Sequence, residues 1–272
     1  MSFWEDEGSA PHELNVQVAH SARMYDYYLG GKDNFAADRE AAEKVLANFP
    51  AMRTTARENR AFLRRAVTHL AAEAGIRQFL DIGTGIPSVD NTHEVAQRVA
   101  PDSRVVYVDN DPIVLTHARA LLVGAPEGST DYLEADLREP DRILEQAWTT
   151  LDPSRPVALM LISILQFLPD DENPRELVRR LTSSLPEGSH LVVSHATADF
   201  LPDTTGTRGT RIYDAAGIPL QLRAHDEILE FFTGHDLIAP GLVPVSEWRA
   251  ETEPGPRPPL SHAALYGAVA RL

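Results

Sequence analysis

From about residue 78 to residue 195, short runs of apolar and β-branched residues alternate with amphipathic segments. This alternation indicates repeated βαβ units, whose strands lie parallel in one sheet. Five strands are predicted at residues 79–82, 104–108, 131–134, 157–164 and 190–195, with helices near residues 88–99, 112–122, 141–149 and 174–185. The sequence therefore predicts an α/β fold with a mostly parallel sheet and helices on both faces.

The 272 residues are expected to form one domain behind a flexible arm at residues 1–20. Helices predicted at 21–29, 36–48 and 54–74 make residues 21–75 a helical extension before the βαβ core at 76–195. Residues 196–222 are rich in Thr, Gly, Asp and Pro, which indicates a loop or lid. A helix at 225–234 and strands at 237–245 and 263–270 complete the region 196–272.

Composition and charge exclude several classes of protein. A net charge of −15 argues against binding a nucleic-acid backbone, because Lys and Arg make most phosphate contacts. The chain has no cysteine and its histidines lack ligand-like spacing, so no metal is expected. No apolar run approaches the ~20 residues of a membrane helix, and the N-terminus is acidic where a secretory signal would be basic. We expect a soluble, cytoplasmic protein without membrane or nucleic-acid partners, and the sequence leaves the oligomeric state open.

The strongest local signal is an apolar strand that runs into a glycine-rich turn, FLDIGTGIPS at residues 79–88. Glycine lets a ligand approach the backbone closely, and open α/β sheets bind ligands at the carboxyl ends of their strands. A dinucleotide fingerprint would need a third glycine at Ser88, which disfavours an NAD-dependent oxidoreductase. Asp81, two residues before Gly83, instead gives the D-x-G-x-G form of proteins that bind S-adenosylmethionine (SAM). Its carboxylate could receive the methionine ammonium group.

Two later strand ends also carry acids. Asp109 ends the second strand, where a carboxylate can accept hydrogen bonds from both ribose hydroxyls. Asp136 and Leu137 follow the third strand and could receive the adenine amino group and pack against its ring. A single aspartate at a strand end is more often a turn or helix cap. Three such acids in register with a glycine-rich loop favour a ligand site over that alternative.

Four segments resemble a family of S-adenosyl methyltransferases known mainly from actinomycetes, whose acceptor is not established. They are ARMYDYYLGGKDNF at 22–35, DIGTGIPS at 81–88, VYVDNDP at 106–112 and SHAT at 194–197, and the resemblance covers residues 20–272. It implies a Rossmann-like class I fold with a seven-stranded sheet, an antiparallel last strand, and SAM as the cofactor. Pro87 departs from the wider superfamily, in which a third glycine is common here. The expected cofactor-binding residues are Asp81, Gly83, Thr84, Gly85, Asp109, Asn110, Asp136, Leu137 and Ser163.

The segment at 22–35 gathers three tyrosines and several charged or amide side chains around a double glycine. Such polar and aromatic density is unusual in a helix with only a packing role, so we expect a lid over the cofactor. The side chains expected to line the lid are Arg23, Tyr25, Tyr28, Lys32 and Asn34. The alternative is that the tyrosines pack the helix onto the sheet while the double glycine ends it.

The acceptor is expected beyond the fourth and fifth strands, beside the region 196–272. Gln166 and His195 lie at these strand ends, and His195 could act as a general base because histidine titrates near neutrality. The catalytic candidates are Tyr25, Tyr28 and His195, although a lone histidine at a strand end is more often structural. The predicted function is methyl transfer from SAM to a small-molecule acceptor. The alternative is a SAM-binding sensor or regulatory protein without transferase activity, because fold does not prove function.

Overall fold

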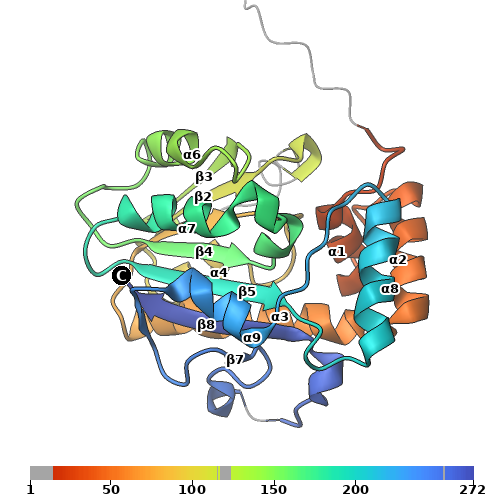
Figure 1. Ribbon diagram of the computed structural model, residues 1–272. Helices are drawn as coiled ribbons and strands as arrows, with labels where there is room; N and C mark the ends of the chain where they lie inside the picture. The colour runs from red at the N-terminus through yellow and green to blue at the C-terminus, as the bar shows by residue number, and fades with distance from the viewer. Residues whose placement is uncertain (1–14, 115, 117–123, 254) are drawn as a thin grey trace, which may run out of the picture.

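The computed structural model describes residues 15–114, 116, 124–253 and 255–272. These residues form an eight-stranded sheet of order β3-β2-β1-β4-β5-β8-β6, in which β7 also pairs with β8 (Figure 1). The parallel strands are β1 (Gln78–Ile82), β2 (Arg104–Asp109), β3 (Ser129–Glu134), β4 (Ala158–Ile162) and β5 (His190–Ala196). The last strand, β8 (Leu265–Arg271), runs antiparallel to β5. The predicted mostly parallel sheet with an antiparallel last strand is confirmed. It has eight strands where seven were expected, and two of them, β6 (Asp236–Leu237) and β7 (Val243–Pro244), have only two residues each.

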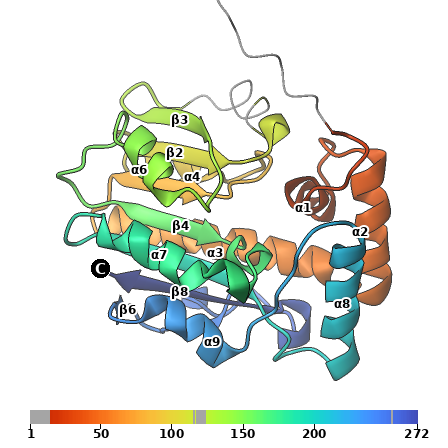
Figure 2. The ribbon, with the colours of Figure 1, turned by 45° about the horizontal axis from the view of Figure 1, so that its top comes forward.

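Helices cover both faces of the sheet, as predicted (Figures 1 and 2). One face packs against α6 (Pro140–Ala147), α7 (Pro174–Ser183) and α9 (His225–Leu229). The other packs against α3 (Met52–Ala72) and α4 (Thr92–Val99). Side chains alternate along β1, where Leu80 and Ile82 enter the first core and Phe79 enters the second. The helix predicted at 112–122 is helical at residues 112–114 and 116, and its remainder lies outside the described residues.

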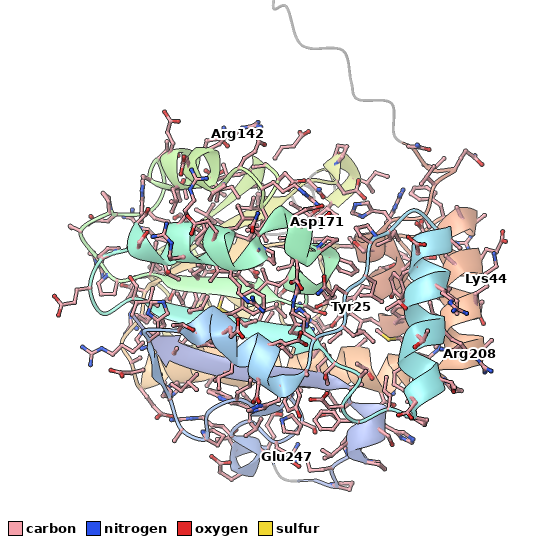
Figure 3. The ribbon with its side chains drawn as sticks, viewed as in Figure 1. Tyr25, Lys44, Arg142, Asp171, Arg208 and Glu247 are labelled. Carbon is pink, nitrogen blue, oxygen red and sulfur yellow. The ribbon has the colours of Figure 1, made fainter. Side chains whose placement is uncertain are left out.

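Three further helices stand together beyond the carboxyl ends of the parallel strands (Figure 2). They are α1 (Ser21–Leu29), α2 (Ala36–Asn48) and α8 (Asp203–Ala215), and they share a small core that includes Met24, Tyr28, Val45 and Tyr213. Lys44 of α2 and Arg208 of α8 point to solvent, whereas Tyr25 of α1 faces inward (Figure 3). The helical extension is thus placed at the edge of the sheet where ligands bind.

Helix α1 has an N-cap and a C-cap of different kinds. Its N-cap is His20, whose Nδ1 accepts a hydrogen bond from the Ala22 backbone N–H at 3.4 Å, and Ser21 is the first helical residue. Gly30 ends the helix with a φ of 84°, a left-handed conformation that glycine adopts readily.

Two expectations for the C-terminal region were wrong. The loop expected at 196–222 contains the 13-residue helix α8, whose Thr and Gly residues favour a helix weakly. Packing overrides that propensity, because Tyr213 inserts into the core shared with α1 and α2. The continuous strand expected at 237–245 is broken into β6 and β7, because Pro240 has no backbone donor and Gly241 adopts a φ of 86°.

Candidate functional site

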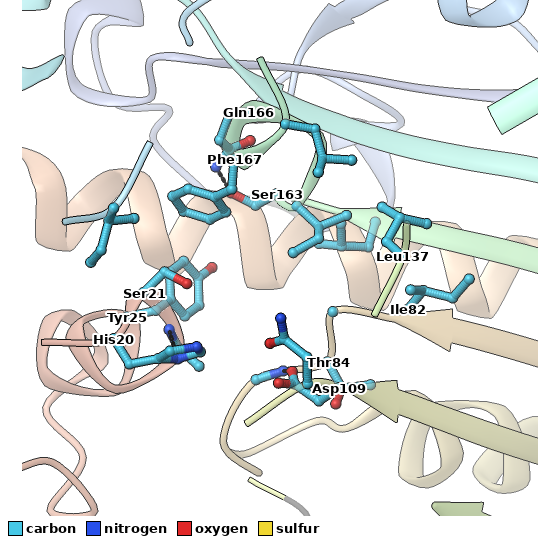
Figure 4. Close-up of a pocket in the computed structure, with 18 of the residues that line it drawn as sticks. His20, Ser21, Tyr25, Ile82, Thr84, Asp109, Leu137, Ser163, Gln166 and Phe167 are labelled. Carbon is cyan, nitrogen blue, oxygen red and sulfur yellow. Dashed lines mark hydrogen bonds between the residues drawn. The ribbon is translucent and has the colours of Figure 1, made fainter. Parts of the chain in front are cut away.

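A cavity of about 390 Å³ lies between the carboxyl ends of β1–β4 and helix α1. The chain fills one half of the sheet with β1, β2 and β3 and then crosses to β4 on the other side, and open α/β sheets bind ligands at such a switch point. Thr84 and Asp109 line one side of this space, while Ser21 and Tyr25 face it from α1 (Figure 4). The volume suits a small-molecule ligand.

The glycine-rich loop after β1 forms the floor of the cavity. Gly83 and Gly85 have φ values of 75° and 65°, a region that other residues rarely adopt. A Cβ on Gly83 would lie 2.6 Å from the Ile164 side chain, so glycine alone fits there. The connection continues past Pro87 until Asn91 caps α4 at Thr92, later than the predicted helix start at 88. Pro87, which stands where the wider superfamily often has a third glycine, therefore lies in the loop before α4 begins.

Asp81 is buried at the end of β1, and its side chain lines the cavity. Thr92 donates its hydroxyl hydrogen to Asp81 Oδ2 at 2.6 Å. Burial raises the pKa of Asp81 to about 6, against the hydrogen bond from Thr92 and the positive charge of Arg60, which lower it. A cationic group bound nearby would favour the ionised carboxylate further.

Asp109 connects the end of β2 to the glycine-rich loop. Its Oδ2 accepts a hydrogen bond from Gly85 N at 2.9 Å, and its Oδ1 accepts one from Asp111 N at 2.9 Å. Burial raises the pKa of this carboxyl group, and the two backbone hydrogen bonds oppose the rise. Each carboxylate oxygen can accept a further hydrogen bond, so Asp109 can still receive a diol from the cavity.

Asp136 and Leu137 line the cavity after β3. Asn110 donates a hydrogen bond to Asp136 Oδ2 at 2.9 Å, and the backbone of Arg138 donates one to Oδ1 at 2.9 Å. Burial tends to raise the pKa of Asp136, but these bonds and the charge of Arg138 lower it overall. The pair presents an ionised acceptor beside the buried apolar side chain of Leu137.

The chain turns sharply after β4. Ser163 has a φ of 56°, which is unusual for a residue with a side chain and is often found at functional sites. Gln166 donates from Nε2 to Ser163 Oγ at 2.7 Å, and both residues line the cavity. With Ser163, all nine residues expected to bind the cofactor line this one cavity: Asp81, Gly83, Thr84, Gly85, Asp109, Asn110, Asp136, Leu137 and Ser163.

The residues expected in the lid divide into two groups. Tyr25 lines the cavity, and its hydroxyl donates to Ala56 O at 3.0 Å while accepting from Asn59 Nδ2 at 3.0 Å. Burial raises the pKa of Tyr25, although Arg60 and Asn59 oppose the rise.

Four of the expected lid residues do not line the cavity. Tyr28 lies in the core of the extension with its hydroxyl 3.2 Å from that of Tyr213. Arg23 Nε lies 3.3 Å from Asp38 Oδ1, and Asn34 donates to Asp26 Oδ2 at 2.7 Å. Lys32 is exposed on the surface. Helix periodicity explains why Arg23 and Tyr28 face away from the cavity that Tyr25 lines. Lys32 and Asn34 lie beyond the end of α1 at Leu29.

His195 is buried beneath the cavity and does not line it. Its Nε2 lies 2.8 Å from Arg223 Nη1, and its Nδ1 lies 2.8 Å from Ala196 O. Arginine can only donate, so Nε2 is the acceptor and Nδ1 carries the proton. Burial lowers the pKa of His195 to about 3, which keeps the ring neutral. This geometry is that of a structural histidine.

Sequence reasoning missed several residues that line the cavity, and Arg60 is the most informative. One side of α3 carries the basic residues Arg57, Arg60, Arg64 and Arg65, of which only Arg57 is exposed. Arg60 donates from Nη2 to Val89 O at 3.0 Å and to Asp90 O at 2.9 Å, which holds it beside the glycine-rich loop. The other missed lining residues include His20, Met52, Asn59, Phe167, Tyr213 and Ile218. No local motif marks these residues, because they meet only when the helical extension packs on the sheet.

The described residues contain neither a metal-binding cluster nor a membrane-spanning helix. No cluster of three or more histidine or carboxylate side chains in this part of the chain could hold a metal ion. No helix of the described ranges is both long and apolar enough to cross a membrane.

Comparison with known proteins gives strong similarities. A family model described as S-adenosyl methyltransferase matches residues 7–272. A DUF574 family protein from Streptomyces avermitilis is 51% identical, with a TM-score of 0.90 over 95% of this chain and 99% of that one. A Thermobifida fusca protein provisionally classed as a methyltransferase is 39% identical, with a TM-score of 0.86 over 99% of both chains. No curated protein matches the sequence significantly.

Proposed function

The chain belongs to the S-adenosyl methyltransferase family, and from this premise we propose that it methylates a small molecule held in the cavity beside SAM. The enzyme is a SAM-dependent methyltransferase whose acceptor is unidentified. One observation carries the proposal: the glycine-rich loop and the carboxylates of Asp81, Asp109 and Asp136 converge on one cavity of about 390 Å³. A space of this size favours a small acceptor over a macromolecule.

The residues around the cavity fit the parts of SAM. Gly83 and Gly85 leave backbone space for the methionine portion, and Asp109 would hold the ribose hydroxyls. Asp136 would accept the adenine amino group while Leu137 packs against the ring. When bound, SAM supplies a methyl group on a sulfonium, which is already activated for displacement.

The methionine end of SAM carries both an ammonium and a carboxylate group, and the cavity has a partner for each. Asp81 would receive the ammonium group and Arg60 the carboxylate. Nε of Arg60 is buried and has no hydrogen-bond partner among the described residues, although buried donors are normally satisfied. The opposite charges of Asp81 and Arg60 interact, as the effect of Arg60 on the pKa of Asp81 indicates. A zwitterionic ligand end would satisfy both groups.

Catalysis by this arrangement would rest on positioning. Placing two reactants in line can supply a large part of a displacement barrier without covalent help from the protein. Tyr25 would limit the access of water from the side of α1, because its hydroxyl is fixed by Ala56 and Asn59. Neither Tyr28 nor His195 lines the cavity, so we assign neither of them a catalytic role.

The partners of the enzyme follow from its charge. A net charge of −15 disfavours a nucleic-acid substrate. The partner that we propose is a small molecule, and the location that we propose is the cytoplasm. The carboxylates that line the cavity favour the cationic cofactor.

Calorimetry followed by product detection tests the proposal. Purified protein is titrated with SAM and with S-adenosylhomocysteine, and micromolar binding of both is expected. The protein is then incubated with labelled SAM and cell extract separated into small-molecule and macromolecular fractions. Label in a small-molecule product supports the proposal, and label in protein or nucleic acid contradicts the small acceptor. Tight SAM binding with no labelled product in any fraction would favour a SAM-binding regulatory protein.

A further inference from the structure

Charge divides the cavity into two halves. The charged or titratable lining residues on the described chain are Asp81, Asp109, Asp136, Arg138, Arg60 and His20. The three aspartates lie at or just after the ends of β1–β3, and the other groups lie beside them. Arg138 Nη1 lies 3.2 Å from Asp136 Oδ1, and His20 Nδ1 lies 3.3 Å from Asp111 Oδ2. Arg60 donates to Val89 O and Asp90 O in the loop after β1. The half that would hold the cofactor therefore contains all the charge found on the described lining.

The opposite half is a neutral wall formed by Met52, Ser163, Gln166, Phe167, Tyr213 and Ile218. Ser163, which the sequence placed among the cofactor-binding residues, is assigned here to the acceptor side. These residues come from α3, from the segment after β4, and from α8 and the turn that follows it. Phe167, Gln166 and Ser163 lie together in Figure 4, facing the space above the glycine-rich loop. No Lys, Arg, His, Asp or Glu of the described lining lies in this half.

The polar groups of the neutral wall are mostly occupied by one another. Gln166 donates to Ser163 Oγ at 2.7 Å, and the Tyr213 hydroxyl lies 3.2 Å from that of Tyr28. The rings of Phe167 and Tyr213 lie 6.3 Å apart, tilted by 39°. The wall thus offers two aromatic rings, the flexible thioether of Met52 and the hydroxyl of Ser163, which can still donate.

We propose that the methyl acceptor is an uncharged, flat aromatic molecule, and that its nucleophile is an unprotonated nitrogen. The inference rests on the proposed function and adds the acceptor class. A charged acceptor would lose its hydration against the neutral wall and gain no opposite charge, which is unfavourable. A flat ring can contact Phe167, Tyr213 and Met52 at once and place one polar atom near Ser163.

The choice of nitrogen follows from the described residues of the neutral wall, none of which can act as a base at neutral pH. Burial raises the pKa of Tyr213 to about 12, so its hydroxyl stays protonated at neutral pH and cannot accept a proton. An acceptor hydroxyl would have to lose its proton before or during attack, which requires a base. A neutral nitrogen attacks with its lone pair: the N–C bond forms, the C–S bond breaks, and the bonding pair stays on sulfur as a neutral thioether. An amine nitrogen then releases its proton to water.

Four quinolines that differ only in the substituent at one position test the charge selection. The probes are 6-aminoquinoline, 6-hydroxyquinoline, quinoline-6-carboxylate and 6-(aminomethyl)quinoline, titrated at about pH 7.5 into protein saturated with S-adenosylhomocysteine. We expect the two neutral compounds to bind at least about tenfold more tightly than the two charged ones. Equal or tighter binding of either charged compound, or binding by none of the four, would overturn the inference.

Methyl transfer separates nitrogen from oxygen. With labelled SAM, 6-aminoquinoline should be methylated at a rate nearly independent of pH between about 7 and 9. Transfer to the oxygen of 6-hydroxyquinoline, distinguished from transfer to its ring nitrogen by the identity of the labelled product, should be slower and should rise with pH, since no base on the described neutral wall can remove the proton. Transfer to the hydroxyl that is equally fast and independent of pH would show that the protein supplies a base, and would reject nitrogen as the preferred nucleophile.

A pair of variants tests the wall itself. Phe167 is half-buried, so Phe167→Glu places a carboxylate at the wall. Phe167→Gln is the control, because glutamine has the shape of glutamate but no charge. Relative to Phe167→Gln, we expect Phe167→Glu to shift the preference toward 6-(aminomethyl)quinoline by about tenfold or more, with similar affinity of both variants for S-adenosylhomocysteine. No shift would overturn the inference. Failure of wild-type protein to bind S-adenosylhomocysteine would instead refute the proposed function, so the two failures are distinguishable.

Discussion

Asp109 Oδ2 accepts a hydrogen bond from the backbone N–H of Gly85 at 2.9 Å. The bond joins the end of β2 to the loop after β1, so the residue proposed to hold the ribose also fixes the path of the glycine-rich loop. The other oxygen accepts from Asp111 N and orders the following turn. Loss of this carboxylate would therefore affect both the ribose contacts and the loop beneath the methionine portion.

Replacing Asp109 with alanine should weaken the binding of SAM and S-adenosylhomocysteine by ~2 kcal/mol or more, because two hydrogen bonds to ribose and the anchor of the loop are lost. Calorimetry measures the change. Glu145→Ala is the matched control, since it removes the same charge from an exposed position on α6. Wild-type affinity in Asp109→Ala would refute the ribose assignment.

Asp81 should make the protein without ligand less stable at neutral pH. Burial raises its pKa to about 6 from the ordinary 3.8, so the folded state binds the proton more tightly than the unfolded chain, and stability falls as pH rises between these values. Asp81→Asn removes the buried charge and keeps an acceptor for Thr92. We expect it to raise the free energy of unfolding in urea by about 1–3 kcal/mol at pH 7.5 and by less than half of that near pH 4.5. An equal gain at both pH values would show that the charge is not the cause.

The parallel core could be predicted because its signals are local. The strand 79–82, the glycine turn and the acids at positions 109 and 136 lie in sequence where the structure places them, since a parallel sheet brings the carboxyl ends of its strands to one edge. Helix α8 could not be predicted in this way. Its sequence favours a loop, and its stability comes from contacts of Tyr213 with helices far away in sequence.

The side chains on the acceptor side of the site could likewise not be predicted from local sequence. Polar density in the segment 22–35 indicates function, but it does not tell which side chains face the ligand. Tyr25 faces the cavity, whereas Tyr28, three residues later, reaches Tyr213 in a separate core. Arg60 resembled a solvated residue because its partners, the carbonyl oxygens of Val89 and Asp90, belong to a loop whose path has no sequence signature.

His195 should prove important for stability rather than for proton transfer. His195→Phe keeps a ring of similar size but removes the acceptor for Arg223 Nη1. The free energy of unfolding should fall by about 1–3 kcal/mol, because a buried donor loses its partner. Affinity for S-adenosylhomocysteine and the pH profile of methyl transfer should stay as in the wild type. A stable variant that binds S-adenosylhomocysteine but has lost an acidic limb of its pH profile would instead identify His195 as a general base.

Arg60 should contribute to binding only when the ligand carries a carboxylate. Arg60→Gln is expected to weaken the binding of S-adenosylhomocysteine by about 1.5–3 kcal/mol, as for a hydrogen bond to a charged group. The same variant should bind 5′-methylthioadenosine, which lacks the amino-acid end, with nearly wild-type affinity. Arg57→Gln is the control, because Arg57 lies one turn earlier on α3 and is exposed. An equal loss for both ligands in Arg60→Gln would mean that Arg60 acts by holding the loop at Val89 and Asp90 rather than by binding the carboxylate.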